Sequence, residues 1–276
     1  ECKAQALKSL KGKWGTPIAA YFIFVGLILV AMLPYFGFIL SVVASGDFIS
    51  DNPVGLMGMA LGALVSLLLM MVFSICILPP LVYGWKKIIA LIANNQEVSA
   101  KDLFSGFKCY GKSMGLYWWC SLWIGLWTLA IYIPLMILVA IFIVVASTNS
   151  SVAVLILPIL IFVIMICLYW VIIYKYISYG FMWNVSIDDS SVGVIDSMNI
   201  SKNITKGNVG KLFVLDLSFL GWIFLSCVTL GIGLLWVIPY AEVTTYNAYR
   251  VLRTLNPSPY MFYFSGTDVE VCGASP

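Results

Sequence analysis

Charge is scarce along this chain. Only 10% of its 276 residues are Asp, Glu, Lys or Arg, whereas 62% are hydrophobic. An average soluble domain carries about 25% charged residues, so too little polar surface remains here to coat a water-soluble globule. Disorder is excluded as well, because disordered chains are rich in charge and poor in apolar residues. The composition therefore indicates an integral membrane protein.

Histidine is absent altogether. This excludes histidine general bases, Ser-His-Asp triads and HExxH zinc sites. The seven cysteines are scattered and never reach CxxC spacing, so we interpret them as small hydrophobic residues and not as a disulfide or metal framework. We accordingly assign no catalytic residue, no metal ligand and no cofactor. The net charge of +3 gives no indication of a nucleic-acid partner.

Six runs with few or no charged residues are candidates to cross a bilayer, which takes about 20 apolar residues, and the first three are longer than needed. They cover residues 16–46, 54–85, 113–147, 151–174, 212–228 and 234–249. Glycines within 229–233 favour a turn between the last two runs. We therefore predict an all-α, polytopic transmembrane bundle of six helices, arranged as three hairpins. These form a single membrane domain (1–256), which a flexible cytoplasmic tail (257–276) follows.

The basic residues lie on one side of this predicted arrangement. All fifteen Lys and Arg precede the first run, follow the last run or lie in the loops of the same side. The opposite loops carry Asp47, Asp51, a Ser/Thr/Asn segment and the glycine turn. Because cytoplasmic loops concentrate Lys and Arg, we predict that both termini are cytoplasmic.

The same map indicates a weak threefold repeat, with hairpins at about 4–95, 102–184 and 194–254. Each of these units begins, ahead of its first long helix, with a segment in which apolar residues recur every three or four positions, at 4–10, 102–107 and 194–204. We predict short amphipathic helices at the inner interface, and the alternative is ordinary basic loops. Aromatic and basic side chains near these points are expected to anchor at the interface: Trp14, Trp85, Lys11, Lys13, Lys112 and Lys211.

Several strings along the chain form a recognisable set. They are LKGKWG at 10–15, DLFSGF at 102–107, KGN at 206–208, LDLSFLGW at 215–222 and TLGIGLLWVIPY at 229–240. Together they resemble an uncharacterised bacterial membrane family, domain of unknown function 975. The resemblance implies a multi-pass protein of the bacterial plasma membrane and supplies no activity. Asp216 departs from the family pattern, and segment 187–191 lacks the proline that the family's Asp-containing loop often carries.

Asp216 and Glu242 are carboxylates inside two of the predicted helices. A charge at the bilayer centre costs roughly 2.5–3.5 kcal/mol on insertion scales, so such residues are candidates for function. With Lys175 as a partner, they could form a cation or proton site. The alternative is structural pairing near the inner headgroups. We favour it because neither carboxylate lies near the midplane.

The only carboxylate cluster is formed by Asp188, Asp189 and Asp196. Aspartates could hold Mg²⁺ against a lipid diphosphate, because hard cations prefer oxygen ligands. There is one tandem pair and no second acidic motif, so we favour a solvated loop or a helix N-terminal charge.

A tryptophan stripe recurs every four residues, at Trp119, Trp123 and Trp127. It could form a stacking groove for a lipid or an aromatic ligand, although lipid-facing or interhelical packing is the more common role of such residues. Gly58 and Gly62 fit GxxxG spacing, which permits close helix approach. Cys272 in the tail is a candidate for lipidation.

Three functions remain open. The first is a non-catalytic membrane protein that interacts with lipids or a membrane protein partner, as an accessory or assembly factor. The second is a small transporter or channel that uses Asp216 and Glu242. The third is a Mg²⁺-dependent transferase that uses Asp188 and Asp189. A homo-oligomer is compatible with each of them.

Overall fold

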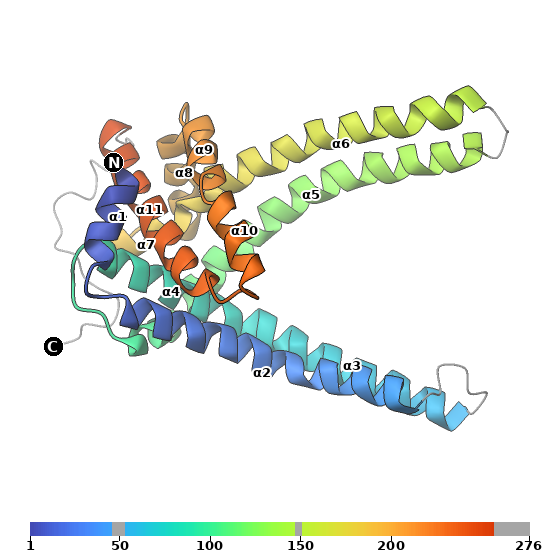
Figure 1. Ribbon diagram of the computed structural model, residues 1–276, viewed down its shortest axis with the longest axis horizontal. Coiled ribbons are helices and arrows are strands. Elements are labelled where there is room, and N and C mark those ends of the chain that lie inside the picture. The colour runs from blue at the N-terminus through green and yellow to red at the C-terminus, as the bar shows by residue number, and fades with distance from the viewer. Residues whose placement is uncertain (46–52, 147–150, 257–276) are drawn as a thin grey trace. The chain divides into compact units, whose positions relative to one another are not determined.

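The computed structural model describes residues 1–45, 53–146 and 151–256 (Figure 1). The predicted tail with Cys272 and the outer-loop residues Asp47 and Asp51 lie outside these ranges. Within them the chain forms helices and turns, without a strand. The prediction of an all-α protein is therefore confirmed.

Eleven α-helices and two short helices of other types follow one another along the described chain. The elements are α1 (Cys2–Leu10), α2 (Gly15–Ser45), α3 (Pro53–Val72), the π-helix η1 (Phe73–Ile77), α4 (Leu78–Ala93), the 3₁₀-helix η2 (Ala100–Phe107), α5 (Tyr110–Ala146), α6 (Ser151–Gly180), α7 (Met182–Asp188), α8 (Val194–Thr205), α9 (Val209–Leu217), α10 (Leu220–Val228) and α11 (Leu234–Leu255). They divide into two compact units. The first contains the described residues of 1–114 and 219–248, and the second contains 115–218 and 249–256.

Five stretches of the described chain are helical, long and apolar enough to cross a membrane. They are Gly15–Val43, Met57–Ala93, Tyr110–Val145, Leu157–Asp188 and Val209–Val228. The predicted count of six is not confirmed, because α11 is not among them. Its apolar part before Glu242 covers residues 234–241, which is about 12 Å of helix. The hydrocarbon core is about 30 Å thick.

In the first unit, α2 and α3 lie side by side as a long hairpin (Figure 1). Large apolar side chains on this hairpin are exposed, among them Phe22, Leu40 and Leu67. Exposure of this kind suits contact with lipid and not with water. The buried residues of the unit gather instead where α1, α4 and η2 pack together.

Between α3 and α4 the helix widens into the π-helix η1, just before Pro79 and Pro80. Proline has no N–H, so these two residues cannot donate to the carbonyls of Ile75 and Cys76. The wider π turn over the preceding residues accommodates this loss.

Two glycines allow α4 and η2 to approach backbone to backbone. A Cβ placed on Gly84 would lie 1.8 Å from the carbonyl oxygen of Leu103, and one on Gly106 would lie 2.0 Å from that of Pro80. No other residue fits at these positions without moving the backbone. The contact brings η2, which contains the DLFSGF string, directly onto α4.

In the second unit, α5 and α6 are long helices that run in opposite directions (Figure 1). Helices α7 and α8 pack on each other and α8 packs on α6, where they bury Met182, Met198 and Ile204. The Ser201 hydroxyl donates to the Ser178 carbonyl over 2.8 Å and so ties α8 to α6.

The three segments predicted as short amphipathic helices are helical, as α1, η2 and α8. Part of each apolar face is buried against protein: Leu10, Leu103 and Ile204 are fully buried. Other apolar residues of these helices, such as Leu7 and Ile195, remain exposed. These helices therefore pack on their own units with one side and leave apolar residues on the surface.

Candidate functional site

A cavity of about 580 Å³ lies in the first unit, between α1, Trp14 and the hairpin of α10 and α11. Its volume falls in the range of roughly 300–1,000 Å³ that is typical of small-molecule sites. The lining is largely aromatic and apolar. It consists of Lys3, Leu7, Trp14, Trp222, Leu225, Ser226, Thr229, Gly233, Trp236, Val237 and Tyr240.

The turn between α10 and α11 gives this cavity its shape. Gly231 has φ +85°, which glycine adopts without strain, and its N–H donates to the Ser226 carbonyl over 2.8 Å. A Cβ on Gly233 would meet the Ser226 hydroxyl at 2.5 Å. The two glycines of the TLGIG string therefore allow the chain to reverse tightly and bring α11 against α10.

The charge of the cavity is positive. Among the described residues that line the cavity, Lys3 is the only one with a charged side chain. Its Nζ lies 4.3 Å from the ring centroid of Phe219, and that ring packs on Tyr240 at 5.2 Å. The ammonium group is attracted by the face of the ring. The arrangement joins a long aromatic surface to one cation, which suits an amphipathic anion.

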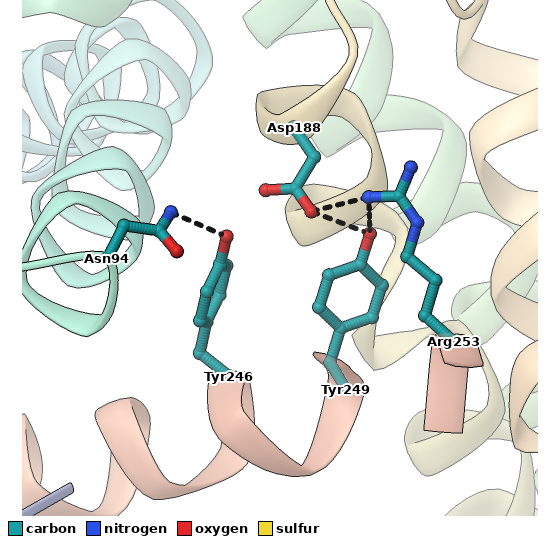
Figure 2. Close-up of polar contacts among 5 residues, drawn as sticks. All are labelled: Asn94, Asp188, Tyr246, Tyr249 and Arg253. Atoms are coloured by element: carbon teal, nitrogen blue, oxygen red, sulfur yellow. Dashed lines mark hydrogen bonds and ion pairs between the residues drawn. The ribbon is translucent and has the colours of Figure 1, made fainter. Parts of the chain in front are cut away.

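Polar contacts from α4 hold α11 in the first unit. The Lys86 Nζ donates to the Glu242 Oε2 over 2.6 Å, and their side chains are 21% and 28% exposed. Asn94 Nδ2 donates to the Tyr246 hydroxyl over 3.3 Å (Figure 2). The carboxylate at position 242 therefore has a cationic partner on a neighbouring helix.

The second unit contains a triad of polar side chains at the end of α11 (Figure 2). Asp188 accepts hydrogen bonds from Arg253 Nη1 over 2.7 Å and from the Tyr249 hydroxyl over 3.0 Å. Burial opposes the charge of Arg253, yet Tyr249 and Asp188 raise its pKa above the ordinary value. The pairing ties α7 to α11.

The alternative of a Mg²⁺ site at the tandem aspartates gains no support from this geometry. Asp188 is taken up by Arg253 and Tyr249, while Asp189 accepts from the N–H and hydroxyl of Ser191 over 2.9 and 2.6 Å. Within the described ranges, no group of three or more Cys, Asp or Glu is placed to hold a metal ion. The tandem aspartates therefore organise helix ends.

The three residues predicted as an intramembrane polar site occupy different surroundings. Glu242 lies in the first unit against Lys86. Asp216 lies on α9 and Lys175 on α6, both in the second unit. The Nζ of Lys175 lies 4.2 Å from the ring centroid of Trp127. Sequence reasoning singled out Lys175 and the tryptophan stripe separately and did not bring them together.

The two predicted tryptophan anchors differ in exposure. Trp14 lines the cavity, where its ring is available to a ligand. Trp85 is 6% exposed and packs on Tyr21 at 5.6 Å between ring centroids. Its ring therefore contributes to the interior of the first unit.

The predicted lysine anchors also have distinct contacts. Lys13 donates to the carbonyls of Asn95 and Gln96 over 3.1 and 3.2 Å, at the C-terminal end of α4, where a cation is favourable. Lys211 donates to Asn208 over 3.0 Å. Lys11 is exposed, and Lys112 on α5 is half-buried.

Sequence reasoning missed Lys86 as the partner of Glu242. It also missed Lys3 in the cavity and Lys202, whose Nζ lies 5.4 Å from the ring centroid of Tyr179. All three were counted as basic residues of one membrane side. A half-buried carboxylate needs a nearby cation, so the presence of a partner could be predicted, but its position depends on how the helices pack.

The long apolar helices, with buried residues gathered at one end of each hairpin, define a multi-pass helical membrane protein. The chain belongs to the family described as Protein of unknown function (DUF975), whose model matches residues 1–256. The resemblance seen in the sequence strings is thereby confirmed.

Short matches to curated proteins also occur. A stretch of 35 residues is 54% identical to the probable anthranilate synthase component 1 of Schizosaccharomyces pombe, and it covers 13% of this chain and 7% of that protein. A stretch of 31 residues is 58% identical to anthranilate synthase component 1 of Saccharomyces cerevisiae, covering 11% and 6%. The chain thus spans 7% or less of the length of these relatives. No solved structure gives a significant match.

Proposed function

We propose that this protein acts without catalysis, by binding a lipid in the aromatic cavity of its first unit. The observation that carries the proposal is the cavity of about 580 Å³, lined by three tryptophans and one lysine. As an accessory or assembly factor, the protein would contact a membrane protein partner through the bound lipid, or through the protein surface around the filled cavity.

The chemistry of the lining supports an amphipathic ligand. Trp14, Trp222 and Trp236 provide an apolar surface, on which an acyl chain can pack by van der Waals contact. Lys3 supplies a positive charge for an anionic headgroup. Among the described residues that line the cavity there is no carboxylate, so no negative charge there would repel an anion.

The cellular setting forms part of the same proposal. The protein would lie in a bacterial plasma membrane with both termini in the cytoplasm, as the distribution of Lys and Arg supports. Lys3, which precedes the first predicted helix, would then lie on the inner side of the membrane.

The other two functions have less support from the contacts. Glu242 is paired with Lys86, an arrangement that favours a structural role over a mobile proton or cation. Asp188 is occupied by Arg253 and Tyr249, so it is not presented to Mg²⁺. The lipid-binding role has a cavity of suitable size and lining in its favour.

Native mass spectrometry of the purified, detergent-solubilised protein tests the proposal. We expect wild-type protein to retain about one phospholipid per chain after extensive detergent washing. The double variant Trp14→Ala/Trp236→Ala removes two of the three tryptophan rings that line the cavity. We expect it to lose at least roughly tenfold in affinity for the lipid, which corresponds to about 1.4 kcal/mol.

The matched control is Trp118→Ala, which truncates a tryptophan that is 42% exposed and outside the cavity lining. Its lipid occupancy should equal that of the wild type. Equal retention by the cavity variant and the wild type, or a wild type that carries no lipid, would contradict the proposal.

A further inference from the structure

Two lysines of the second unit converge on one aromatic cluster. The Nζ of Lys175 on α6 lies 4.2 Å from the ring centroid of Trp127. The Nζ of Lys202 on α8 lies 5.4 Å from the centroid of Tyr179 and 5.7 Å from that of Trp123. The Trp127 Nε1 donates to the Tyr179 hydroxyl over 3.2 Å. The two cations are thus linked through contacting rings.

These lysines have no anionic partner in the described part of the second unit. Neither forms an ion pair there, and Lys202 contacts the amide oxygen of Asn199 at 3.5 Å. Burial, and next the nearby charge of Lys175, lower the pKa of Lys202. Two like charges held together without a counter-charge create a place where an anion is favoured.

A buried hydrogen-bond donor accompanies the two cations. The Nε1 of Trp123 is shielded from solvent and has no hydrogen-bond partner among the described residues. Buried polar groups are almost always hydrogen-bonded, and an exception calls for an explanation. An anion bound beside Lys202 would supply the missing acceptor, because the same Trp123 ring lies under that lysine.

The fold fixes the position of Lys202. The neighbouring residue Ser201 is fully buried, and its hydroxyl donates to the Ser178 carbonyl of α6, next to Tyr179. At the other end of α8, Val194 packs on Gly115 so closely that a Cβ there would meet its Cγ2 at 2.9 Å. Helix α8 is therefore held on α6, and the arrangement of charges does not depend on a mobile loop.

Helix lengths place the cluster at one boundary of the hydrocarbon. A core of about 30 Å takes about 20 helical residues. Counted from the 147–150 connection, 20 residues reach Trp127 on α5 and Trp170 on α6. Lys175 lies one further turn along, at the depth of lipid headgroups.

We propose that Lys175, Lys202 and the Trp123 Nε1 form a phosphate-binding site. The two ammonium groups supply charge and the indole N–H donates a hydrogen bond to a phosphate oxygen. The phosphate belongs either to an anionic lipid headgroup or to a free phosphate ion. The site is separate from the cavity of the first unit and stands without the function proposed for that cavity.

Competition binding distinguishes these sources. Purified protein in detergent is titrated with phosphatidylglycerol or phosphatidylcholine and followed by native mass spectrometry, while inorganic phosphate is titrated by isothermal calorimetry. We expect phosphatidylglycerol to bind at least about tenfold more tightly than phosphatidylcholine. In the Trp14→Ala/Trp236→Ala background, which removes binding by the first-unit cavity, this preference should disappear in Lys175→Gln/Lys202→Gln. If inorganic phosphate displaces phosphatidylglycerol or binds alone, the free ion is the ligand, and otherwise it is the headgroup.

The matched control is Lys101→Gln/Lys108→Gln, which removes the same charge from two exposed lysines of the first unit. It should keep the preference for the anionic probe. Trp123→Phe keeps an aromatic six-membered ring and removes the pyrrole part of the indole with its N–H, and we expect a threefold to tenfold loss of affinity for phosphatidylglycerol. Because it changes few atoms, it also tests the site if the double lysine variant does not fold.

Two results would overturn the inference. One is equal affinity of the wild type for both phospholipids together with no binding of inorganic phosphate. The other is a preference that survives in Trp123→Phe and in the folded lysine variant. Retention of phospholipid in the first-unit cavity is measured separately by comparing the wild type with Trp14→Ala/Trp236→Ala, so failure of one site leaves the other proposal testable.

Discussion

At the scale of single residues, the closest backbone contacts of the first unit depend on glycine. Gly84 faces Leu103, and Gly106 faces Pro80. The absence of a side chain at both positions lets η2 lie directly on α4. Neither glycine has the positive φ that usually explains a required glycine, so close approach alone accounts for them.

Replacing Gly84 with Ala should destabilise the protein by about 1–3 kcal/mol or more, because the added methyl group overpacks a rigid contact. The Cβ would lie 1.8 Å from a carbonyl oxygen, which cannot move without displacing η2. Thermal unfolding in detergent, followed by circular dichroism, measures the change.

Gly26→Ala provides the control for this substitution. Gly26 is also helical, on α2, and nothing lies within 4 Å of the added Cβ. Alanine is a better helix former than glycine by up to about 1 kcal/mol, so this variant should be as stable as the wild type or more stable. A similar loss in both variants would show that the contact with Leu103 is not the cause.

The positions of the candidate-site residues could be predicted only in part. Lys175 and Trp127 were each identified, because a charge and an aromatic stripe are visible in the sequence itself. Their contact was not predicted, and neither was Lys202, because α8 reaches α6 through the buried bond from Ser201 to Ser178. A contact between residues far apart along the chain has no signal in local spacing.

At the scale of elements, most helices agree with the hydrophobic pattern. Long apolar runs predicted α2, α5 and α6 because only helices satisfy their own backbone groups in lipid. The last part of the chain was harder. A turn at Ser218 and Phe219 separates α9 from α10, and the apolar run gave no sign of it. In α11, Glu242 and Tyr246 contact polar residues of α4. These contacts explain why a predicted membrane helix contains such polar side chains.

The turn between α10 and α11 yields a pair of opposite predictions. Gly231 has φ +85° and Leu230 has φ +52°, a region that costs a non-glycine residue roughly 1–2 kcal/mol. Gly231→Ala should therefore destabilise the protein by about that amount, and Leu230→Gly should stabilise it by up to a similar amount.

Thermal unfolding of both variants in the same detergent compares these effects. Ile232→Ala serves as the control, because it shortens an exposed side chain of the same turn at a position without positive φ. Equal shifts in the same direction for Gly231→Ala and Leu230→Gly would contradict the argument from backbone conformation.

At the scale of the whole molecule, the chain has two units with similar ingredients. Each contains a hairpin of long apolar helices and a smaller group of buried helices: α1, α4 and η2 in the first unit, and α7 and α8 in the second. Helices α5 and α11 begin in the first unit and end in the second. The division follows from packing among the described residues, and the single membrane domain over residues 1–256 stays a prediction.

The number of crossings has a direct test. If the distribution of basic residues decides orientation, Lys206 and Arg250 lie on the cytoplasmic side together. In a background without native cysteines, Lys206→Cys and Arg250→Cys should react with a membrane-impermeant maleimide only after the cells are permeabilised.

Both positions are exposed, so burial does not block the reagent. Ser150→Cys, in a predicted outer loop, should react in intact cells and serves as the positive control. Labelling of Arg250→Cys from outside, with Lys206→Cys protected, would mean that 209–228 crosses alone and that the predicted pairing of the last two helices is wrong.

The tip between α10 and α11 has one more consequence for how the protein enters a bilayer. Its amides donate within the hairpin, from Leu230 to the Cys227 carbonyl, from Ile232 to the Thr229 carbonyl and from Gly233 to the Thr229 hydroxyl. Leu230 itself is 94% exposed. The amides at the tip thus have acceptors within the hairpin and its most exposed side chain is apolar, which lowers the cost of placing the tip in lipid. The Thr229 hydroxyl has a specific part in this, because it accepts the Gly233 N–H, which would otherwise require a water molecule.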